Sequence, residues 1–173
     1  MNLKFQIPDN WLITERTAAE EAAGGVSELI KAHLRDKNSR TAPKKGFRKT
    51  DYWDEVAESV TTSIDGKRIS VSIEKEGAAL HYFGGTVYPN KAKALAIPLS
   101  PLVQDIWPSE QPSNLELFWP KNSPHGFLKD ANTSELLYLL VSKATIPADK
   151  TVLPEDGDIL KAAEEAIWEA IQK

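Results

Sequence analysis

The fold of this chain is decided around residues 79–98, which read ALHYFGGTVYPNKAKALAIP. The apolar run 80–88 predicts a strand in which Gly84 and Gly85 permit a bulge or a close backbone approach. A short turn leads into a second predicted strand, residues 94–97. The paired glycines also suit a phosphate cradle, but the spacing of a Walker loop and a following helix start are absent. We therefore predict a structural hairpin that is a candidate assembly surface.

A long helix is predicted near the N-terminus, over about residues 15–35. Mostly apolar side chains recur there at spacings of three and four, which places them on one helix face. This stripe comprises Ala18, Ala22, Val26, Leu29, Ile30, His33 and Leu34. Gly24 and Gly25 interrupt it and are compatible with a kink, a close helix crossing or a break into two helices.

Two further helices are predicted by the same spacing. A short one covers residues 52–60, and an amphipathic one follows residue 158 to the end of the chain. The apolar face of the last helix comprises Ile159, Leu160, Ala163, Ile167, Trp168 and Ile171.

Strands are expected between these helices. Asp65-Gly66 favours a tight hairpin turn between 62–64 and 68–73, where apolar and polar residues alternate. Further strands are predicted over 115–119 and 126–129. A near-continuous apolar run over 135–146 predicts a strand covered on both faces.

The order of these elements predicts an α+β fold, with an antiparallel β-sheet packed against a long N-terminal helix, a short second helix and a C-terminal helix. A length of 173 residues is ordinary for one domain. We therefore expect a single domain over 1–173, with an extended N-terminal segment at 1–13 and a basic loop at 36–50. The prolines of 101–114 predict an irregular excursion.

The composition excludes several classes of site. A formal net charge of −4 is too small for an acidic tail, although local patches can exist beneath it. The absence of cysteine removes disulfides, thiolate metal sites and cysteine nucleophiles, and suits a reducing cytoplasm. No apolar run has the length of a signal peptide or a membrane span, so neither export nor a membrane partner is expected.

Two basic segments are candidates for partner contact. Lys44, Lys45, Arg48 and Lys49 lie in the basic loop. Clustered cations can neutralise phosphates or contact an acidic partner, whereas a solvated connection is the alternative, because loops are ordinarily charged and exposed. The turn at 90–93 adds Lys91 and Lys93.

The three histidines, His33, His81 and His125, are far apart in the sequence, and none has a second histidine at metal-binding spacing. His33 is expected on a helix face, His81 in strand packing and His125 in a loop. A serine elbow and an EF-hand loop are also absent. We therefore predict no catalytic residue, metal, cofactor or small-molecule substrate. The alternative is a small hydrolase or nuclease that uses His81 or His125.

The five tryptophans divide into two groups. Trp53, Trp119 and Trp168 lie in regular predicted elements and are expected in the core. Trp11 and Trp107 lie in irregular, proline-flanked segments, which makes them candidates for partner contacts.

Four blocks of the chain carry a resemblance to a known family. The most specific is residues 80–98, with its Gly-Gly-Thr and Ala-Ile-Pro tripeptides. The others are HLRDKN at 33–38, YW at 52–53 with AESV at 57–60, and LLV at 139–141 through IPAD at 146–149 to VLP at 152–154. On these residues the chain resembles small tailed-bacteriophage and prophage proteins of virion morphogenesis and tail completion, similar to the Mu G-type group.

The resemblance implies a non-enzymatic neck or tail protein that forms a ring of copies where tail meets head. It implies self-association and docking to neighbouring neck and tail proteins, first in the bacterial host cytoplasm and then in the virion. The basic loop would face the DNA channel or an acidic surface of the portal. The expected assembly surface comprises Trp11, Lys44, Lys45, Arg48, Lys49, Gly84, Gly85, Lys91, Lys93 and Trp107. A stand-alone nucleic-acid-binding module that uses residues 37–49 is a further alternative.

Overall fold

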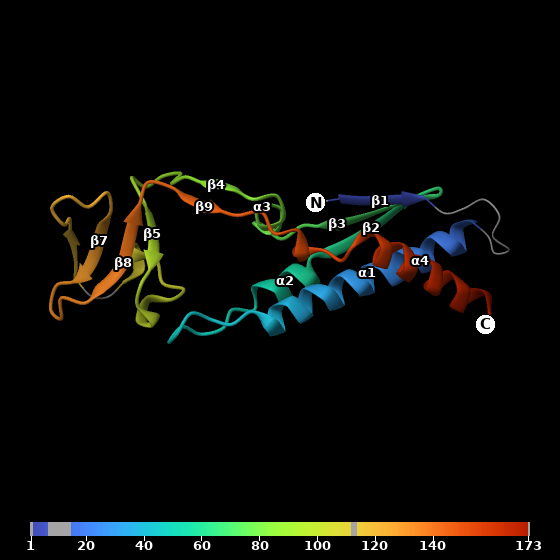
Figure 1. Ribbon diagram of the computed structural model, residues 1–173, viewed down its shortest axis with the longest axis horizontal. Coiled ribbons are helices and arrows are strands. Elements are labelled where there is room, and N and C mark those ends of the chain that lie inside the picture. The colour runs from blue at the N-terminus through green and yellow to red at the C-terminus, as the bar shows by residue number, and fades with distance from the viewer. Residues whose placement is uncertain (1, 7–14, 112–113, 173) are drawn as a thin grey trace. The chain divides into compact units, whose positions relative to one another are not determined.

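The structure is a computed structural model that describes residues 2–6, 15–111 and 114–172. It confirms the α+β fold, and every described strand pair is antiparallel (Figure 1). The contacts divide the chain into unit 1, which comprises Met1–Thr41, Thr50–Gly84 and Pro147–Lys173, and unit 2, which comprises Ala42–Lys49 and Gly85–Ile146. The sequence predicts one antiparallel sheet, whereas residues 85–146 build two sheets and a core that are separate from those of unit 1.

Unit 1 contains the four α-helices of the described chain and a three-stranded sheet of order β1-β3-β2. Its elements are β1 (Asn2–Gln6), α1 (Glu15–Arg40), α2 (Tyr52–Glu58), β2 (Val60–Asp65), β3 (Arg68–Ile73), α3 (Ala78–Phe83), the 3-10 turn η3 (Lys150–Val152) and α4 (Asp156–Ile171). The predicted hairpin is confirmed: Asp65 pairs with Arg68, and Gly66 takes a φ of 59° in the two-residue turn.

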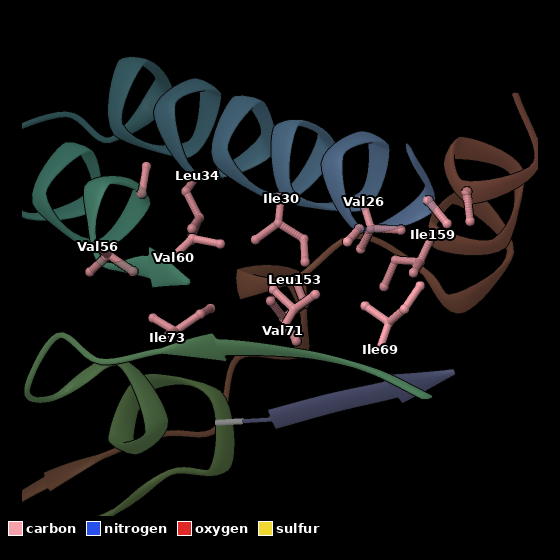
Figure 2. Close-up of a cluster of buried hydrophobic side chains, with 14 of the residues drawn as sticks. Val26, Ile30, Leu34, Val56, Val60, Ile69, Val71, Ile73, Leu153 and Ile159 are labelled. Atoms are coloured by element: carbon pink, nitrogen blue, oxygen red, sulfur yellow. The ribbon is translucent and has the colours of Figure 1, made fainter. Parts of the chain in front are cut away.

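The core of unit 1 lies between the sheet and α1 (Figure 2). Val26, Ile30 and Leu34 line the inner face of α1 and are fully buried. Ile69 and Val71 of β3 point toward them. Burying a side chain of this size contributes about 1.5–3 kcal/mol, so this contact accounts for much of the stability of unit 1. The helical stripe predicted from the sequence is confirmed.

Helix α1 runs through both glycines without a break. A Cβ atom on Gly25 would lie 2.7 Å from the carbonyl oxygen of Ala162 and 2.7 Å from the Cβ atom of Ala166, both in α4. Of the three alternatives at the glycine pair, the close helix crossing is therefore correct, and it falls at Gly25. No atom lies within 4 Å of the corresponding position on Gly24.

The basic loop predicted over 36–50 begins later than expected, because α1 continues to Arg40. Asn38 is buried, and its Nδ2 atom donates a hydrogen bond to Asp54 Oδ2 at 2.5 Å. Arg40 forms an ion pair with Asp36, one turn earlier. These contacts hold the last turn of the helix, although its composition is that of a loop.

The strand predicted over 80–88 is wrong over 80–83, which belong to α3, and correct over Gly85–Val87, which form β4. The helix begins after Gly77, whose φ is 87° and whose carbonyl oxygen accepts a hydrogen bond from His81 N at 3.0 Å. Gly84, at a φ of 74°, ends it. A short apolar run carries too little periodicity to separate a helix from a strand, and the contacts of α3 in unit 1 decide between them.

Unit 2 consists of short strands in two sheets. Its elements are β4 (Gly85–Val87), β5 (Leu95–Pro98), the 3-10 turns η1 (Pro101–Val103) and η2 (Pro108–Glu110), β6 (Leu115–Phe118), β7 (Gly126–Asp130), β8 (Leu136–Val141) and β9 (Ala144–Ile146). The hairpin predicted within 79–98 does not form, because β4 pairs with β9 and β5 pairs with β8. The longer β8 becomes a central strand in the order β5-β8-β7-β6.

The core of unit 2 is small and contains Val103, Leu137 and Tyr138. The hydroxyl of Tyr138 donates a hydrogen bond to the carbonyl oxygen of Ile106 at 2.8 Å. The Pro-rich excursion thus packs against the sheet, and its irregular course is as predicted. The single strand predicted over 135–146 is two strands, with Ser142 and the exposed Lys143 between them.

The predicted positions of the tryptophans are partly wrong. Trp53 is buried as expected, but Trp119 and Trp168 are 57% and 58% exposed. Leu160 was expected on the buried face of the last helix and is 54% exposed. The buried face of α4 is narrower than the apolar face predicted from its sequence, because α4 contacts α1 along a single line of side chains. Trp11 lies outside the described residues.

Candidate functional site

The three histidines have separate and different surroundings. His33 Nε2 lies 2.9 Å from the carbonyl oxygen of Thr151. The ring of His81 packs against Tyr52 and Trp53, with centroid distances of 5.4 and 5.2 Å. His125 is exposed, in the loop between β6 and β7. Over the described parts of the chain, no group of three or more His, Cys, Asp or Glu side chains could hold a metal ion.

The best-connected polar cluster of unit 1 surrounds Asp149. Its Oδ2 accepts a hydrogen bond from Lys37 Nζ at 2.7 Å, and its Oδ1 accepts hydrogen bonds from the backbone N–H and hydroxyl of Thr151, at 2.9 and 2.6 Å. The hydrogen bond from Lys37, followed by that from the Thr151 hydroxyl, lowers the pKa of Asp149 to about 2. Lys37 Nζ also lies 5.3 Å above the Trp53 ring.

The hydrogen bonds of this cluster attach residues 147–152 to the helices of unit 1. Asp149 caps η3 and its backbone N–H donates to the carbonyl oxygen of His81 at 2.9 Å. A single residue thereby joins α1, α3 and η3. The sequence does not reveal this connection, because Lys37 and Asp149 are 112 positions apart.

A shallow cavity of about 230 Å³ lies beside the cluster. Its lining includes His33, Lys37 and Arg40, which would suit an anion. However, Lys37 is paired with Asp149 and Arg40 is paired with Asp36. Because these cations already have carboxylate partners, the cavity is part of the structural network rather than a ligand site.

The candidate assembly residues of the basic loop belong to unit 2 and are exposed. Arg48 forms an ion pair with Asp105 at 3.1 Å, and its backbone N–H donates to Gln104 Oε1 at 2.7 Å. The loop is therefore attached to the segment after η1. Lys44 Nζ lies 5.4 Å above the ring of Phe47.

The other candidate residues of unit 2 are exposed, with one exception. Lys91 and Lys93 lie between β4 and β5, and Lys49 is exposed beside Arg48. Trp107, at the start of η2, is 71% exposed. The exception is Gly85, which is half-buried in β4 and pairs with Ile146.

Gly84 has a structural task. A Cβ atom there would lie 2.7 Å from the backbone nitrogen of Ala148. Close backbone approach, one of the two alternatives predicted for the glycine pair, is therefore confirmed at Gly84. Beside it, Lys150 Nζ lies 3.9 Å above the ring of Tyr82 and 4.8 Å above that of Phe83.

The two units differ in charge. Unit 2 has nine Lys or Arg residues and five Asp or Glu residues, whereas unit 1 has 12 and 20. The formal net charges are therefore +4 and −8, which together give the −4 of the whole chain. The sequence did not reveal this division of charge between the units, because the net charge was counted over one predicted domain. Counting separately over 85–146 and the basic loop would have found it.

In the described residues, no helix combines the length and the apolar character needed to cross a membrane. Comparisons with protein-family models, with curated proteins and with solved structures find no match for this chain.

Proposed function

We propose that this protein is a structural component of phage morphogenesis that acts by self-association and by docking to neighbouring virion proteins. Its expected station is the head–tail junction or the end of the tail. The resemblance of residues 80–98 to virion morphogenesis proteins supports this proposal. Under this proposal, the protein acts in the bacterial host cytoplasm during assembly and then in the virion.

The observation that carries the proposal furthest is the exposed aromatic surface of unit 2. Tyr88, Trp107 and Trp119 are each more than half exposed in a unit whose own core is small. Aromatic residues are enriched where protein surfaces meet, because they bury a large area at a low cost in conformational entropy. A protein that works by docking uses such side chains.

The alternatives have less support. A hydrolase or nuclease at His81 would need carboxylates near the ring, and the described contacts of that ring are aromatic. A nucleic-acid-binding module is favoured by the net charge of unit 2, which is +4. Salt-dependent binding of duplex DNA by the purified protein would test it.

Deletion of the gene from its phage, followed by electron microscopy of the lysate, tests the proposal. We expect unjoined heads and tails, or tails of abnormal length, and few infective particles. Supplying the intact protein should restore the yield. A normal yield of infective particles from the deletion would overturn the proposal.

Two substitutions locate the surface. Trp107→Ala removes a 71% exposed ring and should leave the fold intact while lowering the yield. Lys121→Ala, another exposed position of unit 2, is the matched control and should restore the yield fully.

A further inference from the structure

The outer face of α4 is acidic and partly apolar. Ile159 and Ile167 point into the core, whereas Leu160, Glu164 and Trp168 follow one another at four-residue intervals and are exposed. Figure 2 shows Ile159 on the core side of the helix. The exposed stripe is thus a pair of large apolar side chains with a carboxylate between them.

Asp156 and Asp158 in the first turn of α4 suit the helix dipole, but the carboxylates further along the helix do not all contribute to its stability. The last turn of the helix carries Glu169 and no basic side chain. A carboxylate at the C-terminal end of a helix opposes the helix dipole and costs stability. Lys161 is the one cation within α4, and it pairs with Glu165 at 3.6 Å. Glu164 and Glu169 form no ion pair with the described residues.

The basic side chains of unit 2 are complementary to this face. Within the part of the chain that the structure describes, Lys45, Lys91 and Lys93 form no ion pair and are exposed. Lys44 contacts the ring of Phe47, which leaves its charge accessible at the surface. Exposed Trp107 supplies an apolar side chain in the same unit.

We propose that the basic loops of unit 2 in one copy dock on the acidic outer face of α4 in a second copy, head to tail. The inference rests on the self-association in the proposed function and names its surfaces. Each copy of the chain carries one basic surface and one acidic surface. The formal net charge is +4 for unit 2, which holds the basic loops, and −8 for unit 1, which holds α4. Complementary charge of this kind steers encounter and fixes the orientation of partners.

A head-to-tail contact uses different surfaces on its two sides. Each added copy therefore offers one unused basic surface and one unused acidic surface. Contacts of this kind continue until the rotation closes into a ring, or else form a filament. A ring of copies, as in the proposed function, is compatible with a contact of this kind.

Charge reversal tests the contact directly. The lysine variant carries Lys44→Glu, Lys45→Glu, Lys91→Glu and Lys93→Glu. Its own α4 stays acidic, so copies of this variant should repel one another. Sedimentation velocity over a range of protein concentrations measures association at low salt and at high salt, where exposed charges are screened.

The helix variant carries Glu164→Lys and Glu169→Lys. Both sites are exposed, and the second change removes an unfavourable charge from the end of α4, so the fold should be kept. We expect each variant alone to weaken association by about tenfold or more at low salt. An equimolar mixture of the two should restore it, because both contacts in the mixture join opposite charges.

A control variant, Glu58→Lys with Glu76→Lys, makes the same charge change in unit 1 outside α4. We expect it to associate like the wild type. Equal loss in the control, or no recovery in the mixture, would overturn the proposal and leave self-association through another surface intact. A wild type that stays monomeric at every concentration would overturn both this proposal and the self-association in the proposed function. DNA binding by that monomer, lost in the lysine variant, would favour the nucleic-acid alternative.

Discussion

Gly25 of α1 lies so close to Ala162 of α4 that an added methyl group would come within 2.7 Å of its carbonyl oxygen. The contact is with backbone, which cannot move aside as a flexible side chain can. The neighbouring Gly24 has open space at the same position. The two adjacent glycines thus differ in the space beside them, and alanine substitutions at the two positions should change the free energy of unfolding differently.

Gly25→Ala should lower the free energy of unfolding by about 1–3 kcal/mol, because the helices must separate to admit the methyl group. Gly24→Ala should raise it by up to about 1 kcal/mol, through the better helix propensity of alanine. Urea unfolding followed by ellipticity at 222 nm reports unit 1, which holds all the described α-helices. Equal effects of the two substitutions would contradict the close crossing.

The carboxylate of Asp149 should make the stability of unit 1 depend on pH. Its pKa is lowered from 3.8 to about 2 in the fold, so its hydrogen bonds to Lys37 and Thr151 stabilise the protein above pH 3.8. This contribution is lost as the pH falls through that range toward 2. Because the side chain is 41% exposed, solvent screens the interaction.

Asp149→Asn should therefore cost about 1 kcal/mol or less at pH 7, with a deficit that shrinks as the pH falls below about 4. Urea unfolding at a series of pH values measures it. Glu20→Gln removes an exposed pairing with Arg16 and is the control, with an expected change below about 0.5 kcal/mol. A deficit that stays constant down to pH 2 would mean that charge is not the cause.

The hydroxyl of Tyr138 should stabilise unit 2. The side chain is buried, which raises the pKa of the phenol, and it donates to the carbonyl oxygen of Ile106. Tyr138→Phe leaves that carbonyl without its partner and should cost about 1–2 kcal/mol. Faster hydrogen exchange of the β7 and β8 amides would report the loss. Tyr88→Phe, at an exposed ring, should leave these amides unchanged.

Gly84→Ala should loosen the junction between α3 and the segment before η3. The residue has a φ of 74°, and its added methyl group would meet the backbone of Ala148. Strain of this kind costs about 1–3 kcal/mol. The amide of Asp149, which donates to His81, should then exchange faster. Gly157→Ala, with open space around it, is the control and should not change that exchange.

Elements with many repeats of one period could be predicted from the sequence. The stripe from Ala18 to Leu34 predicts α1, and the alternation from Arg68 to Ile73 predicts β3, because each repeat adds evidence for the same face. The turn at Gly66 was predictable for a local reason, since few residues accept a positive φ. The candidate lysines were found by composition alone, and the structure shows them exposed.

Short segments and distant contacts were decided by the tertiary structure. Residues 78–83 are mostly apolar and could form either a strand or a helix, and the choice follows from what they pack against. The strands β4 and β5 pair with β9 and β8, which lie much later in the sequence. The pairing of Lys37 with Asp149 spans 112 positions. Local sequence thus determined the long, strongly periodic elements and their buried faces, as in α1 and β3. Packing decided which segments pair, where the chain divides into two units, and that Gly84 and Gly25 are points of close approach, because these depend on residues that meet only in the folded chain.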